Sequence, residues 1–108
     1  MMNEGELKQR FNELVGSSEI KWKIFCLFRK HDSLNYRAVA TILNIQKTNA
    51  SACLADLEAL GLLRAERYGS YALNGKNLAD ALGNALALKA SKLNMTAMNL
   101  KISAEVSS

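Results

Sequence analysis

A short run of polar side chains near the middle of the chain has the chemistry needed to recognise nucleobases. Gln46 and Asn49 carry amides that can bond adenine through two hydrogen bonds, and Lys47 can reach guanine. If the run opens a helix, its N-terminal amides also favour a phosphate. The alternative is an ordinary helix start in solvent, with Thr48 or Asn49 as its cap. The candidate base-contacting residues are Gln46, Lys47, Thr48, Asn49, Ser51 and Ala52.

Basic residues are concentrated in the stretch that leads to this run. The 108 residues carry a net charge of +4, whereas residues 21–50 alone hold six basic side chains against the single Asp32. Such a stretch can attract a polyanion, or it can be a solvated basic face. Arg37 is the best candidate for a phosphate contact, because it opens the helix that precedes the polar run. The basic residues are Lys21, Lys23, Arg29, Lys30, Arg37 and Lys47.

Apolar residues recur at helical spacing in five segments, and the chain has no proline to interrupt them. The spacing predicts helices over about 4–15, 18–30, 34–43, 47–60 and 76–93. Ser17 or Ser18 can cap the second helix, Ser33 or Asn35 can open the third, and Asn44 and Gly61 suit left-handed stops. The first and last apolar stripes contain Leu7, Phe11, Leu14 and Val15, and Leu78, Leu82, Ala85, Leu86 and Leu93.

Residues 62–73 are expected to form a hairpin, because two short apolar runs flank Arg67-Tyr68-Gly69. Two short helices joined by a turn, followed by such a ribbon, predict a winged helix-turn-helix, with the helix-turn-helix at about 34–61 and the wing at about 62–73. Arg64 and Arg67 can then contact phosphates or the minor groove, or remain solvated beside Glu66. Tyr68 can bond a phosphate or only cover the hairpin.

The predicted fold class is therefore α+β, mainly α, in a single domain over residues 1–100 with a polar, flexible tail at 101–108. The helices at 4–15 and 76–93 lie outside the helix-turn-helix and the wing. Their apolar stripes are expected to stay partly exposed in one copy of so small a domain. We therefore expect them to pair across a two-fold axis and form a homodimer.

The segment from Leu43 to Leu63 resembles the recognition-helix region of ArsR-type winged-helix regulators. The resemblance covers roughly residues 18–93 and implies a winged helix that binds double-stranded DNA, usually as a repressor. MarR-type and other winged-helix regulators share the Gly-Leu ending followed by a ribbon. The positions that match the family's pattern are Ala50, Ser51, Leu54, Leu57, Gly61 and Leu62.

The chain departs from that family at its metal sites. Asn35 and Arg37 stand where many members have a Cys-x-Cys pair, and the last helix has Asp80 but no histidine. We therefore expect no bound metal and no other cofactor. Cys26 and Cys53 are too few for a disulfide framework and are expected to be small buried hydrophobes, with a thiol switch as the minor alternative.

The sequence lacks a phosphate-binding glycine loop, paired catalytic carboxylates and an apolar run long enough to span a membrane. We therefore expect a cytoplasmic protein that is not an enzyme. The predicted function is sequence-specific binding of double-stranded DNA by a homodimeric transcriptional regulator, most simply a repressor at a palindromic operator. The alternative is a winged-helix module that binds another protein, because Asp56 and Glu58 offset Lys47 on the fourth helix.

Overall fold

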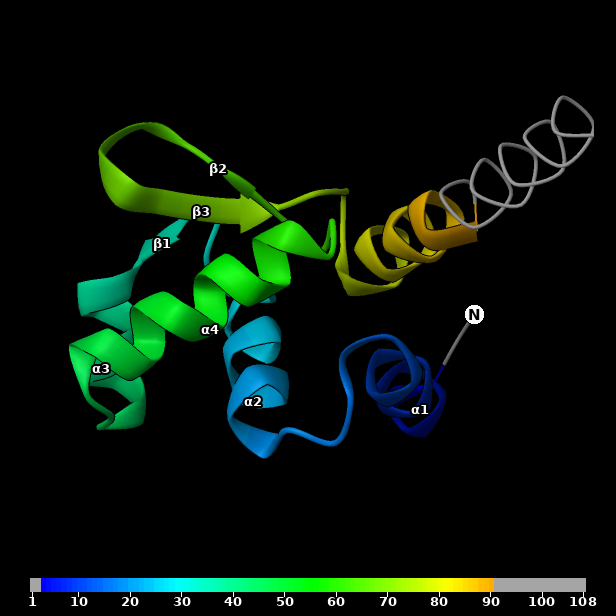
Figure 1. Ribbon diagram of the computed structural model, residues 1–108, viewed down its shortest axis with the longest axis horizontal. Coiled ribbons are helices and arrows are strands. Elements are labelled where there is room, and N and C mark those ends of the chain that lie inside the picture. The colour runs from blue at the N-terminus through cyan, green and yellow to red at the C-terminus, as the bar shows by residue number, and fades with distance from the viewer. Residues whose placement is uncertain (1–2, 91–108) are drawn as a thin grey trace, which may run out of the picture.

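The structure is a computed structural model that describes residues 3–90. It is a mainly helical α+β arrangement with a three-stranded antiparallel sheet, and its order is compatible with the predicted winged helix-turn-helix (Figure 1). A final helix begins at residue 78 and is described to residue 90. The labelled elements are α1 (Glu4–Val15), α2 (Glu19–Leu27), β1 (Leu34–Asn35), α3 (Tyr36–Leu43), α4 (Lys47–Ala59), β2 (Leu63–Ala65), the turn η1 (Arg67–Gly69) and β3 (Ser70–Leu73).

Side-chain caps fix where several helices begin. Ser18 accepts a hydrogen bond from the amide of Lys21 at 3.3 Å, and Asn35 accepts one from the amide of Ala38 at 2.8 Å. Each cap satisfies a first-turn N–H group that has no partner inside the helix. At the other end of α3, Asn44 adopts left-handed backbone angles (φ 54°, ψ 53°), which confirms the predicted stop.

The sheet has the strand order β1-β3-β2. The predicted hairpin is confirmed: β2 and β3 pair antiparallel with Leu63 opposite Leu73 and Ala65 opposite Tyr71. Strand β1 pairs with the other edge of β3, with Leu34 opposite Tyr71. The sequence did not predict β1, because two residues are too few to show the alternation that marks a strand.

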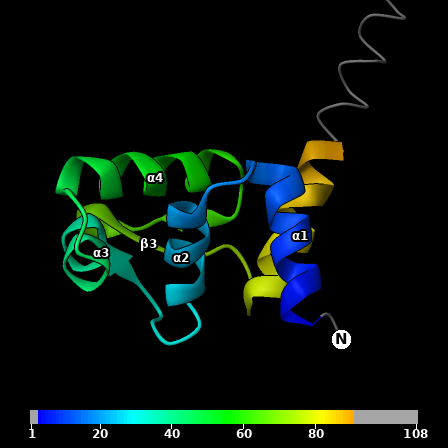
Figure 2. The same cartoon turned by 90° about the horizontal axis from the view of Figure 1, so that it is seen from below.

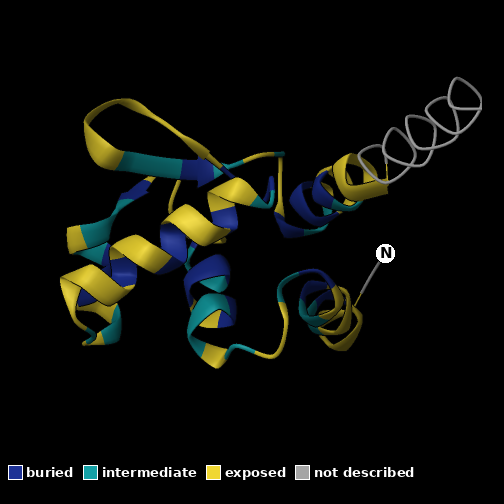
Figure 3. Cartoon of the chain, in the orientation of Figure 1, coloured by how far each residue is buried: buried dark blue, intermediate teal, exposed yellow. Residues whose placement is uncertain are grey.

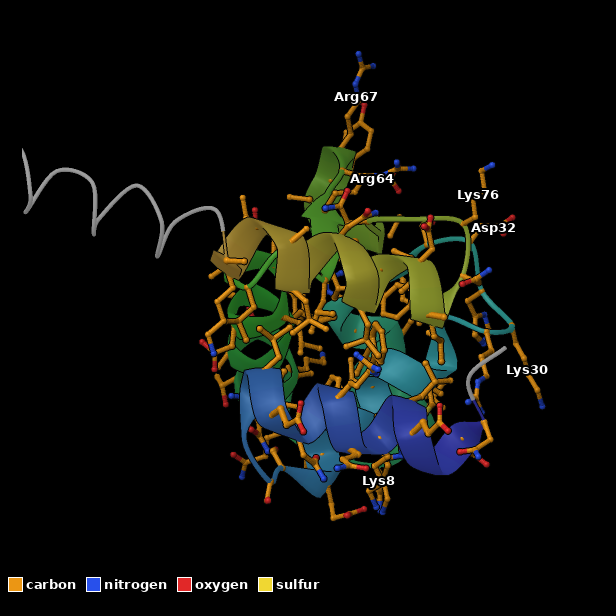
Figure 4. The ribbon with its side chains drawn as sticks, turned by 90° about the vertical axis from the view of Figure 1, so that its right-hand side faces the viewer. Lys8, Lys30, Asp32, Arg64, Arg67 and Lys76 are labelled. Carbon is orange, nitrogen blue, oxygen red and sulfur yellow. The ribbon has the colours of Figure 1, made fainter. Side chains whose placement is uncertain are left out.

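The core is a continuous apolar cluster that includes both terminal helices. Phe11 of α1 is fully buried, and its ring centroid lies 5.2 Å from those of Trp22 and Phe25 in α2. Such aromatic pairs add to the stabilisation that comes from burial alone. Figures 2 and 4 place α1 and the 78–90 helix at the same end of the molecule, with side chains between them.

The apolar stripes of the terminal helices are mostly buried within one copy of the chain, because the core between these helices and α2 is continuous. Val15 and Leu86 are half-buried, so the expectation of partly exposed stripes holds only for these two of the described stripe residues. On the 78–90 helix, Leu88 is the large apolar side chain that stays exposed, at 43%. Leu93 and the predicted tail at 101–108 lie outside the described residues. The buried stripe residues are Leu7, Phe11, Leu14, Leu78, Leu82 and Ala85.

Candidate nucleic-acid interface

Helix α4 is held by one face and exposes the other. Ala50, Leu54 and Leu57 are fully buried, and Cys53 is 7% exposed. These four positions recur at helical spacing, so the side chains between them must point away from the core. The alternation of buried and exposed residues along α4 is visible in Figure 3.

The predicted polar run forms the start of α4. Gln46 is the N-cap and makes no side-chain capping bond, so the alternative that Thr48 or Asn49 caps the helix is wrong. Both lie inside the first turn of α4 because the helix begins at Lys47. The start of a helix carries partial positive charge and amides that can bind a phosphate. The exposed residues here are Gln46, Lys47, Thr48, Asn49, Ser51 and Ala52.

Arg37 stands on the first turn of α3 and is exposed. Its guanidinium lies over the ring of Tyr36, 5.6 Å from the centroid, and its Nε donates a hydrogen bond to the Tyr36 hydroxyl at 3.1 Å. Stacking limits the conformations of a long side chain without neutralising it. This role of Tyr36 is not visible in the sequence, where its spacing indicates only an apolar position of the helix.

The start of α4, α3 and the turn of the β2–β3 hairpin lie toward the same end of the molecule, on the left of Figure 1. Among residues 3–90, three exposed cations of this end, Arg37, Lys47 and Arg67, form no salt bridge. An unpaired exposed cation can neutralise a phosphate without first breaking another ion pair. This end of the molecule therefore combines uncommitted positive charge with short polar side chains.

Arg64 shares a surface cavity with Arg67, Glu66 and Ser33, and it also lines a second cavity. Its neighbour Leu63 is buried, so the pleat of β2 turns Arg64 to the other face of the sheet. There Arg64 helps to line a surface cavity of about 290 Å³ with His31, Asp32 and Lys76. Figure 4 shows Arg64, Asp32 and Lys76 on the same side of the hairpin. The sequence does not reveal this grouping, because His31 and Arg64 are more than 30 positions apart along the chain.

The second half of α4 has the opposite charge from its first half. Asp56 and Glu58 are exposed, and the Asp56 carboxylate accepts a 3.0 Å salt bridge from Lys21 of α2. A polyanion that approaches α4 is therefore attracted to its first two turns and repelled by the last two, except where Lys21 offsets the charge. The pair also ties α4 to α2 at the edge of the core.

Both cysteines are free thiols, and burial raises the pKa of each above the usual value. Cys53 is buried as predicted, whereas Cys26 is half-buried. The Cys53 thiol also donates a long hydrogen bond of 3.6 Å to the Asn49 side chain. A raised pKa keeps a thiol protonated and less nucleophilic at neutral pH, so these surroundings do not favour a redox switch. That role stays a prediction.

Comparisons with known proteins add no relatives to this description. No protein-family model matches the chain, and no curated protein is significantly similar to it. Among residues 3–90, no group of three or more histidine, cysteine or acidic side chains is arranged to hold a metal ion. Within the same range, no helix is both long and apolar enough to cross a membrane.

Proposed function

We propose that this chain is a winged helix-turn-helix regulator that binds double-stranded DNA. The observation that carries the proposal is the two-sided character of α4, which anchors one face in the core and exposes short polar side chains on its first two turns. The order α2, β1, α3, α4, β2, β3 supports it, because a winged helix has this succession of elements. In such proteins the second helix of the pair enters the major groove by its N-terminal residues.

In the proposed complex, the first turns of α4 lie in the major groove. Gln46, Lys47 and Asn49 contact base edges, while Arg37 on α3 neutralises a phosphate of the flanking backbone. Arg67 at the turn of the hairpin reaches the adjacent backbone or minor groove. Phosphate contacts supply most of the affinity, and the start of α4 supplies the preference for one sequence.

We propose that the protein acts as a cytoplasmic, non-enzymatic repressor, and that a homodimer presents two α4 helices to half-sites about one duplex turn apart. The partial support for a dimer is Leu88, which is a large apolar side chain exposed on the 78–90 helix. Light scattering at micromolar concentration tests this part separately. A monomer would overturn the dimer and leave DNA binding by a single domain intact.

The second half of α4 favours a different candidate function, a module that binds another protein. Ala52, Ala55, Asp56 and Glu58 are exposed on this helix, and small or acidic side chains are a poor lining for a DNA groove. In that case the exposed face of α4 would receive a basic segment of the partner. Neutralisation of Lys47 distinguishes the two functions, because it should weaken the binding of DNA but not the binding of a basic segment of a partner protein.

The test is selection from sheared genomic DNA at several salt concentrations, with the retained fragments sequenced. We expect one sequence to be enriched and its affinity to fall steeply as salt rises, because bound counterions are released. Lys47→Gln should reduce binding, whereas Lys23→Gln, which removes an exposed charge on α2, should change it less. Binding without enrichment, or equal losses in both variants, would overturn recognition by α4 and favour the protein-binding module.

A further inference from the structure

Tyr68 occupies an unusual position at the end of the β2–β3 hairpin. Its side chain is 96% exposed, and its backbone is left-handed (φ 62°, ψ 33°). The next residue, Gly69, is also left-handed (φ 72°). A left-handed conformation suits glycine or asparagine, but it is unfavourable for a bulky aromatic residue. The turn therefore carries a residue that is poorly suited to its backbone.

The ring makes no compensating contribution to the fold. The alternative that Tyr68 only covers the hairpin is wrong, because a side chain that is almost fully exposed covers nothing. The other tyrosines behave differently: Tyr36 and Tyr71 are half-buried and pack against the core. Glycine or asparagine would close the same turn with less strain. Strain that the fold does not need is a reason to look for a partner outside the chain.

The neighbours of Tyr68 indicate the chemistry of that partner. Arg67 is exposed and forms no salt bridge within the described residues, whereas the carboxylate of Glu66 lies 3.9 Å from Arg64. Figure 4 shows Arg67 projecting beyond the end of the hairpin. The turn thus presents an aromatic face beside an uncommitted guanidinium. Nucleic acids offer both complements, a flat base to stack on the ring and a phosphate to pair with the cation.

We propose that Tyr68 is a base-stacking residue, whose ring receives a nucleobase while Arg67 contacts a neighbouring phosphate. One face of that base must not be stacked on a neighbouring base. The hairpin therefore binds either a duplex at a weakened or opened base-pair step or a single strand. The inference rests on the proposed function, because it supposes that the protein binds nucleic acid. The inference goes beyond the proposed function because the hairpin then contacts a base of the nucleic acid, and not only its sugar-phosphate backbone.

The experiment compares three fluorescein-labelled probes: a 20-base-pair duplex, the same duplex with a central mismatch, and its single strand. We expect the wild type to prefer the mismatched duplex, because that probe offers both a major groove for α4 and a base that is free to stack on the ring. Tyr68→Asn should bind that probe about tenfold more weakly, in line with the usual contribution of one stacked base. Tyr68→Phe should bind like the wild type, because it keeps the ring and loses only the hydroxyl.

Urea unfolding of the same variants separates stacking from a structural role. Because asparagine tolerates the left-handed turn, Tyr68→Asn should have a urea midpoint at least equal to that of the wild type. A lower midpoint, unchanged binding by Tyr68→Asn, or equal losses in Tyr68→Phe would each overturn the proposal. Weak binding by Lys47→Gln alongside normal binding by Tyr68→Asn would overturn the stacking and keep the function of α4. A wild type that binds no probe and no genomic fragment would overturn both.

Discussion

Helix α4 and the β2–β3 hairpin are held in the molecule in different ways. Four side chains of α4 are buried in the core, and α2, α3 and β2 pack around it. The hairpin is anchored near its base by Leu63 and Ala72, and its turn residues Arg67, Tyr68 and Gly69 are all exposed. A site on a rigid element keeps its geometry, whereas a turn without core contacts can adjust to its ligand. We therefore propose that α4 selects the DNA sequence and that the hairpin adapts its conformation to the bound DNA.

The largest expected effect on stability comes from truncating a side chain of α4 that is buried in the core. Leu54 is fully buried, so Leu54→Ala should destabilise the fold by about 2–5 kcal/mol through lost burial and the cavity left behind. Urea unfolding followed by the fluorescence of buried Trp22 measures this. The matched change on the hairpin, Arg67→Ala, should alter stability by less than about 0.5 kcal/mol. Similar losses in both variants would contradict the difference in anchoring.

Removal of side chains from the exposed start of α4 should weaken binding without affecting the fold. We expect Lys47→Ala and Asn49→Ala each to cost about 1–3 kcal/mol at the preferred DNA site. Fluorescence anisotropy on that site and on a scrambled duplex measures the change in preference. Lys23→Ala is the control, since Lys23 is exposed on α2. If both α4 variants keep the wild-type preference, another element recognises the sequence.

Much of α4 and its turn could be predicted from the sequence, because the signals are local. Leu54 and Leu57 mark the buried face, Asn44 ends the preceding helix in a left-handed conformation, and Gly61 is left-handed after α4. Gly61 also has a packing role, since a Cβ there would meet the Leu88 side chain at 3.1 Å. The close approach of the 78–90 helix to the turn after α4 is not visible in the sequence.

Features that depend on distant contacts could not be predicted. The sequence does not show how far the stripes of the terminal helices are buried, because their burial depends on contacts between distant segments, such as the packing of Phe11 on Trp22 and Phe25. Arg64 is close to Arg67 in sequence and shares a surface cavity with it, but Arg64 also lines a second cavity with His31 and Asp32, which are more than 30 positions away. The sequence leaves open whether Tyr68 bonds a phosphate or only covers the hairpin, because it does not report how exposed the ring is.

A substitution in the turn between α3 and α4 should have a smaller effect on stability. Asn44 is left-handed, so Asn44→Ala should cost about 1 kcal/mol, while Asn44→Gly should be close to neutral. This turn sets the direction in which α4 leaves α3. We expect both variants to keep the wild-type preference for one DNA sequence as long as the turn and the fold are intact. Urea midpoints and anisotropy on the preferred site measure both quantities. An alanine variant as stable as the glycine variant would show that the left-handed angles impose no strain.

The smallest expected effect concerns the acidic half of α4. Asp56→Asn removes the 3.0 Å salt bridge to Lys21, and because the Asp56 side chain is 59% exposed, the loss of stability should be at most about 1 kcal/mol. The change also removes a negative charge beside the proposed groove contact and frees a cation. Affinity for a scrambled duplex at low salt should therefore rise a few-fold, and the gain should disappear at high salt because screening shortens the range of both charges. Glu19→Gln is the control, since it frees Lys8 of α1 in the same way but removes no charge from α4. An equal gain in both variants would mean that net charge alone governs binding, and the difference between the two halves of α4 would then have no part in it.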